Sequence, residues 1–161
     1  MAKFLFFNAL LLACCGYALL RGGAPERIAA SIFTIGTGLT VVAASGAAGR
    51  FASLEVGILA VDALALLAFL VLALCAERFW TLWLTALQAI GTAGHAIKMV
   101  DPEGLPWAYA FALAFWSYPM LLLIAFGTGR HQKRLAKFGA DRSWSSFSVP
   151  WGRQPGTGPT N

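Results

Sequence analysis

The sequence predicts an all-α integral membrane protein built as a compact bundle of five transmembrane helices. Of the 161 residues, 58% are hydrophobic and only 12% are charged, whereas a soluble domain is about one quarter charged. The apolar residues gather into five runs of about 20 residues each, the length that crosses a hydrocarbon core of about 30 Å as a helix. Each run must be helical because a backbone group without a hydrogen-bond partner is not tolerated in lipid.

The first two predicted helices cover residues 4–20 and 28–49 and are joined by a short polar turn. The connecting sequence, "RGGAPE", places Gly22 and Gly23 after the first apolar run and Pro25 just before the second. Glycine is common directly after a helix, and proline is well tolerated in the first turn of one. The two helices are therefore expected to lie side by side with opposite directions.

The third and fourth predicted helices cover residues 56–76 and 79–100, and little more than Glu77 and Arg78 joins them. So short a connection predicts a tight antiparallel hairpin. The fifth helix, residues 107–127, follows "DPEGLP", whose two prolines and one glycine indicate a turn. None of the connections has room for a domain outside the membrane, so residues 1–129 form one transmembrane domain.

The remaining residues, 130–161, are expected to form a basic and largely disordered tail in the cytoplasm. It begins "RHQKRLAK" and becomes rich in Ser, Gly and Pro, a composition that does not fold alone. Basic residues interleaved with aromatic ones favour contact with anionic headgroups, worth about 1 kcal/mol per cation near the surface. The residues expected to anchor the tail to the membrane surface are Arg130, Lys133, Arg134, Lys137, Trp144 and Trp151. Because the tail contains no recognisable nucleic-acid-binding module, no nucleic acid is expected as a partner.

The distribution of positive charge predicts the orientation of the bundle. Loops rich in Lys and Arg remain on the cytoplasmic side. One side would carry Arg21, Arg27, Arg78, Arg130, Lys133, Arg134, Lys137, Arg142 and Arg153, and the other only Lys3, Arg50 and Lys98. The C-terminus is therefore expected in the cytoplasm and the N-terminus outside. The abundance of Ala and Gly, together with the minimal loops, suggests the inner (plasma) membrane of a bacterium.

The N-terminus allows a second interpretation. The sequence Leu-Leu-Ala-Cys, which ends at Cys14, matches the pattern of a lipoprotein signal. Cleavage before Cys14 would remove residues 1–13. Cleavage would leave four helices and place the basic tail outside, against the charge rule. Asn8 also interrupts the supposed signal core. An uncleaved first helix is favoured, and processing stays open as the alternative.

Four polar residues interrupt the predicted membrane helices and are the candidate site for a ligand or a proton: Asp62, His95, Lys98 and Gln88. Such residues are costly in lipid, so each is a functional candidate. Asp62 and His95 are each about 16 residues from the hairpin turn, so at 1.5 Å per residue they lie at the same depth. Depth follows from counting, but the rotation of each helix does not. A single Asp/His pair falls short of the three or four ligands of a zinc site, so neither a metal nor a cofactor is expected.

Three function classes remain. The first is a non-enzymatic accessory or structural subunit, which contacts the bilayer and either other membrane subunits or copies of itself. The second is a small proton- or cation-linked transporter or sensor that uses Asp62, His95 and Lys98. The third is a membrane enzyme acting on a lipid or a quinone near Glu77, Arg78 and Arg130. No nucleophile motif or phosphate-binding loop supports the third class, so an enzyme is not favoured.

Overall fold

A computed structural model describes residues 2–44, 56–100, 115–139, 141 and 143–144, with no side-chain description at 2, 44, 56 and 95–100. Within this part of the chain there are five helices and no β-strand, which confirms the all-α prediction. The helices are α1 (Ala2–Arg21), α2 (Ala24–Ala44), α3 (Val56–Cys75), α4 (Phe79–Val100) and α6 (Ser117–Phe138).

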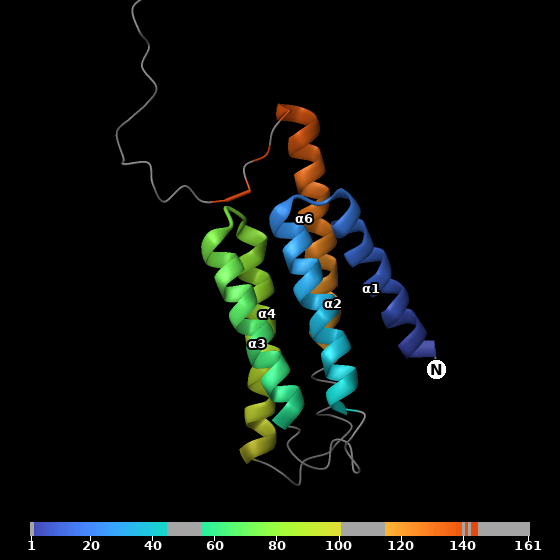
Figure 1. The fold of residues 1–161 in the computed structure, drawn as a ribbon, viewed down its shortest axis with the longest axis vertical. Helices are drawn as coiled ribbons and strands as arrows, with labels where there is room; N and C mark the ends of the chain where they lie inside the picture. Colours follow the sequence, from blue (N-terminus) through green and yellow to red (C-terminus); the bar gives the residue numbers. More distant parts are fainter. Residues whose placement is uncertain (1, 45–55, 101–114, 140, 142, 145–161) are drawn as a thin grey trace, which may run out of the picture.

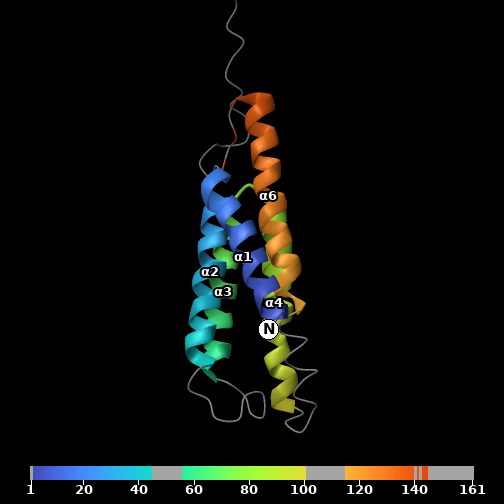
Figure 2. The ribbon, with the colours of Figure 1, turned by 90° about the vertical axis from the view of Figure 1, so that its right-hand side faces the viewer.

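The five helices lie roughly along one common axis (Figures 1 and 2). α3 packs against α4 and α2, while α1 packs against α2 and α6. α6 also contacts α4 and α2, so it closes the bundle between its first and fourth helices. The turn from α1 to α2 and the turn from α3 to α4 lie at the same end of the bundle, where the second half of α6 extends beyond them (Figure 1).

Three helices are long and apolar enough to cross a membrane, over Lys3–Arg21, Ala24–Ala43 and Gly57–Cys75. Within the described residues, neither α4, which carries Gln88, His95 and Lys98, nor α6, whose second half is basic, is among these candidate spans. The part of the chain that the structure describes therefore contains three candidate spans, and the five expected spans stay a prediction.

Side chains on the outside of the bundle have the character of a surface that faces lipid. Leu20 is 78% exposed, Leu12 70% and Val42 70%. A soluble protein rarely exposes apolar residues over so much of its surface. The interior is formed by large side chains such as Phe69 and Leu121, and by small ones that let α1 and α2 approach closely: Ala18, Ala29 and Ala30. These features identify a helical membrane protein.

The last helix differs most from its predicted bounds. The sequence predicts a helix over 107–127 and a disordered tail from 130, but α6 continues without a break to Phe138. The hydroxyl of Thr128 donates to the carbonyl of Ile124 at 2.9 Å, and His131 is buried against the other helices. Gly139 ends the helix in the left-handed conformation (φ 70°), where its N–H donates to the Leu135 carbonyl at 2.9 Å. The predicted start at 107 lies outside the described residues.

Candidate functional site

Ionisable residues, most of them with buried side chains, gather at the end of the bundle where the two turns meet α6. We call this group the charge cluster: Glu26, Arg78, His131, Arg134 and Asp141. Glu26 comes from the first turn of α2, Arg78 from the turn between α3 and α4, and Asp141 from the segment after α6. The cluster thus joins three parts of the chain that are far apart in the sequence.

Asp141 is the centre of the charge cluster. Its Oδ2 lies 2.6 Å from Arg78 Nη2 and 2.6 Å from His131 Nδ1, and its Oδ1 lies 2.8 Å from Arg134 Nε. An ionised carboxylate only accepts hydrogen bonds, so all three nitrogens donate to it. The Asp141 side chain is 5% exposed. Asp141 therefore ties the α3–α4 turn to α6 through short, charge-assisted bonds.

These bonds keep Asp141 ionised. Burial alone would raise the pKa of its carboxyl group, since a charge is less stable away from water. The hydrogen bonds from Arg134 and His131 act in the opposite direction, as do the positive charges of Arg78 and Arg134, and together they hold the pKa of Asp141 below its usual range.

Glu26 is the second acid of the charge cluster and is fully buried. Its Oε1 lies 3.7 Å from Nε of Arg78, an ion pair too long for a hydrogen bond. Neither carboxylate oxygen has a hydrogen-bond partner among the described residues. The carboxylate lies at the N-terminus of α2, where the helix dipole favours negative charge. Arg78 thus lies between two acids, close to Asp141 and farther from Glu26.

Two glycines allow the α1–α2 turn to approach the cluster. A Cβ atom on Gly22 would lie 2.4 Å from the carbonyl oxygen of Ala18, and one on Gly23 would lie 2.9 Å from Cε1 of His131 and 3.0 Å from Oε2 of Glu26. No larger residue fits at either position without displacing its neighbours. The turn therefore packs its backbone directly against α6.

A third glycine brings α4 and α6 together. A Cβ atom on Gly127 would lie 2.6 Å from Cε2 of Trp80, so the indole ring lies directly on the backbone of α6. Trp80 is 6% exposed, and its Nε1 has no hydrogen-bond partner among the described residues. Beside it, the hydroxyl of Thr81 donates to the carbonyl of Arg78 at 2.6 Å and fixes the start of α4.

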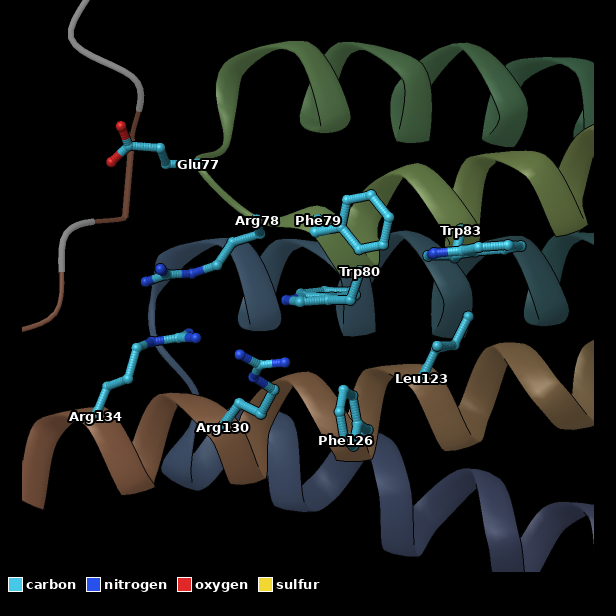
Figure 3. A pocket seen from close by; sticks show the side chains of 9 residues that line it. All are labelled: Glu77, Arg78, Phe79, Trp80, Trp83, Leu123, Phe126, Arg130 and Arg134. Carbon is cyan, nitrogen blue, oxygen red and sulfur yellow. The ribbon is translucent and has the colours of Figure 1, made fainter.

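A cleft of about 560 Å³ opens beside the charge cluster (Figure 3). Its polar side is formed by Arg78, Arg130 and Arg134. The other residues that line it are Glu77, Phe79, Trp80, Trp83, Leu123 and Phe126. Figure 3 shows the three guanidinium groups turned toward a common space, with the carboxylate of Glu77 turned away from them. The cleft combines a cationic side with an aromatic one.

Of the four residues in the predicted intramembrane group, the structure describes the side chains of two, Asp62 and Gln88. Nε2 of Gln88 lies 3.4 Å from both the backbone carbonyl oxygen and Oδ1 of Asp62, so α3 and α4 do bring these two residues together. A small cavity of about 50 Å³ lies beside them, against Trp116. His95 and Lys98 lie on α4, but their side chains are outside the described ones. The proximity of Asp62 and His95 stays a prediction.

The residues predicted to anchor the tail have different environments. Lys133 and Lys137 are exposed on α6. Arg130 is also exposed, and its guanidinium lies 5.7 Å from the ring centre of Phe126. Arg134 instead points into the charge cluster. Trp144 is 43% exposed, and its backbone forms an isolated antiparallel bridge with Ala76; Trp151 lies outside the described residues.

The sequence analysis missed Glu26, His131 and Asp141 as site residues. The sequence pattern places Glu26 only in a loop, and it places His131 and Asp141 in the tail. One signal was present: the short turns place Glu26 and Arg78 at the same end of the bundle, where an acid and a base can pair. The position of Asp141 had no such signal, because it depends on α6 continuing to Phe138.

The cluster and its cleft are suited to hold negative charge rather than a metal ion. Within the described residues, no three side chains of His, Cys, Asp or Glu are grouped so that they could bind a metal. Cationic groups outnumber acids around the cleft.

Comparison of the chain with protein-family models, curated proteins and solved structures finds no match.

Proposed function

We propose that this protein is a non-enzymatic accessory or structural subunit of a bacterial inner membrane, with five spans, its N-terminus outside and its C-terminus in the cytoplasm. The observation that carries the proposal is the charge cluster. Asp141 engages cations from the α3–α4 turn and from α6, which holds the helices in one arrangement. A rigid bundle with a fixed cytoplasmic end is what a subunit that positions other proteins requires.

The position of the described cations supports the orientation. Arg21 ends α1, Arg78 lies in the α3–α4 turn and Arg130 lies on the second half of α6, all at the same end of the bundle (Figure 1). The positive-inside rule assigns such an end to the cytoplasm. The fifth span would combine residues 107–114 with the first half of α6.

The exposed apolar surface supports a role in assembly. Large side chains such as Phe6 (63% exposed), Ile35 (62%) and Leu74 (62%) point outward from three different helices. Lipid tails or the helices of another membrane subunit can cover them equally well, because both are apolar. The buried polar groups of the charge cluster, in contrast, bind one another and stabilise the bundle itself.

The test is native mass spectrometry of the full chain, purified through a C-terminal tag in a mild detergent. The proposal predicts a stoichiometric complex with another membrane polypeptide or with copies of this chain. It also predicts that proteoliposomes holding the chain alone show no proton flux above empty vesicles. A monomer that catalyses flux would contradict the proposal.

A proton- or cation-linked role is the second candidate because Asp62 lies beside a cavity. The cavity of about 50 Å³ has room for a water molecule, which needs about 10 to 15 Å³ by the same measure. A carboxylate that contacts water inside a membrane helix is a suitable proton carrier. Under this candidate, Asp62→Asn abolishes flux in proteoliposomes. Asp141→Asn, which lies after α6 beside the α3–α4 turn, leaves a flux that Asp62→Asn still abolishes. Flux that survives Asp62→Asn would exclude this role.

A further inference from the structure

The cleft beside the charge cluster contains hydrogen-bond donors that the described residues leave unused. Trp80 Nε1, Arg78 Nε and Arg134 Nη2 are all buried and have no hydrogen-bond partner among the described residues. Buried donors are almost always paired in folded proteins. In Figure 3 the indole nitrogen of Trp80 faces the guanidinium groups of Arg78 and Arg130. Three guanidinium groups that turn toward one space favour an acceptor-rich group there (Figure 3).

One of the three arginines that line the cleft has no acidic partner among the described residues. Arg78 and Arg134 bind Asp141, and Arg78 also lies 3.7 Å from Glu26. Arg130 forms no ion pair with any residue that the structure describes, and its guanidinium lies 5.7 Å from the ring centre of Phe126. A guanidinium is a planar fork that binds phosphate through two parallel bonds. The missing acceptor is therefore expected to be anionic.

The other side of the cleft is apolar and open to the membrane. Phe79 is 73% exposed, Trp83 56% and Phe126 55%. These rings continue from the arginines along α4 and α6 in the direction of the bundle's middle (Figure 3). The candidate span of α3 ends at Cys75, directly before the turn that carries Arg78. The arginines thus lie where the hydrocarbon ends, and the aromatic residues lie within its edge.

We propose that this cleft binds one anionic phospholipid, with the phosphate held by Arg78, Arg130 and Arg134 and an acyl chain lying on Trp83 and Phe126. The geometry matches a molecule with a charged head and an apolar tail. A free phosphate would satisfy the donors but leave the exposed rings uncovered. The inference rests on the proposed placement of this end of the bundle at the membrane surface, and it adds a bound lipid to the subunit role.

The test titrates the full-length chain, purified in detergent, with dioleoyl phosphatidic acid and measures one-to-one binding by native mass spectrometry. Dioleoyl phosphatidylcholine is the comparison, because its chains are the same and its head carries no net charge. Phosphatidic acid is expected to bind at least about tenfold more tightly, since the cleft attracts negative charge. Equal affinities for the two lipids would overturn the proposal.

Arg130→Gln is the informative variant, because Arg130 is exposed and has no ion pair within the described residues, so its loss leaves the charge cluster intact. It is expected to weaken phosphatidic acid binding about five- to tenfold. Lys133→Gln is the matched control: it removes one positive charge from the same helix but does not line the cleft. Its effect is expected to stay below about twofold. Equal losses in both variants would show surface attraction without a site, and would overturn the proposal.

A third measurement distinguishes a bound lipid from a bound free phosphate. Inorganic phosphate at millimolar concentration is expected not to displace phosphatidic acid, because it cannot cover Trp83 and Phe126. Full displacement would overturn the assignment of a lipid. All these measurements use the isolated chain. Their failure would not contradict the subunit proposal, which is tested by copurification of a polypeptide.

Discussion

Two polar regions of this membrane bundle differ in the contacts that the structure describes for their carboxylates. At the charge cluster, Asp141 binds Arg78, His131 and Arg134 at 2.6 to 2.8 Å. Farther along α3, the contact between Asp62 and Gln88 is 3.4 Å long and lies beside a small cavity. The first region joins charged groups from distant parts of the chain, and the second includes a contact between a carboxylate and a neutral amide on the adjacent helix.

The difference indicates different roles. A buried carboxylate surrounded by cations has little freedom to bind anything else, and removing it leaves several buried charges unpaired. A carboxylate that lies on a membrane helix beside a cavity is a candidate for binding water or a ligand. The charge cluster is therefore suited to hold the fold, while the Asp62 region is the place where chemistry within the membrane would occur. The predictions below test this contrast, beginning with the largest effect.

Asp141→Asn is expected to have the largest effect, a loss of about 3 kcal/mol in the free energy of unfolding. The amide is almost the same size, but it cannot compensate the charges of Arg78 and Arg134. Unfolding in mixed micelles of increasing SDS content, followed by tryptophan fluorescence, measures the change. Lys137→Gln, which alters an exposed charge on α6, is the control and is expected to change stability by less than about 0.5 kcal/mol. Equal effects of the two substitutions would refute the central place of Asp141.

Acid is expected to weaken the same interaction reversibly. The pKa of Asp141 is lower in the folded chain than its usual value, so its contribution is fully present above about pH 4. That contribution is lost as the pH falls through the lowered folded value, because the unfolded state then binds the proton more readily. Unfolding curves of the wild type and of Asp141→Asn should therefore converge below about pH 4. A constant difference down to pH 2 would contradict this assignment.

Gly127→Ala is expected to cost about 2 kcal/mol, because the added methyl group would overlap the indole ring of Trp80. Gly129→Ala is a matched control two residues away on the same helix, where no atom lies within 4 Å of the added carbon. Alanine should stabilise α6 there by up to about 1 kcal/mol through helix propensity. Opposite signs at the two positions are the expected outcome of the micelle unfolding assay. A neutral Gly127→Ala would show that α4 and α6 do not meet through Trp80.

Gln88→Leu is expected to have the smallest effect, a loss of about 0.6 kcal/mol, which is typical of one interhelical hydrogen bond in a membrane protein. The same unfolding assay measures it, with Thr92→Val as a control on the same helix, since that hydroxyl bonds within α4. A loss as large as that of Asp141→Asn would remove the contrast between the two regions.

The helices that sequence analysis locates best are those bounded by strong local signals. The predicted ranges 56–76 and 79–100 agree with α3 and α4 to within a residue, because Glu77 and Arg78 interrupt a long apolar run. The predicted end at 127 is wrong for α6. The sequence "GTGR" resembles a helix end, but Gly127 is required by the close approach of Trp80, and Thr128 bonds within the helix.

The charge cluster was beyond prediction for a different physical reason. Arg78 and Asp141 are 63 residues apart, and their contact depends on the length of α6 and on the chain's return past the α3–α4 turn. Charge counting assigns Arg78 and Arg134 to the cytoplasmic surface, but it does not reveal which cations find a buried acid. The contact between Asp62 and Gln88 was easier to anticipate, since both lie within one antiparallel hairpin.

The most direct test of the central claim is a double-mutant cycle between Arg78→Gln and Asp141→Asn in the micelle unfolding assay. If Asp141 ties the α3–α4 turn to α6 through Arg78, the two losses overlap, and the cycle gives a coupling of about 2 kcal/mol. Losses that add to within about 0.5 kcal/mol would mean that the two residues act independently. The charge cluster would then not be what holds this end of the bundle together.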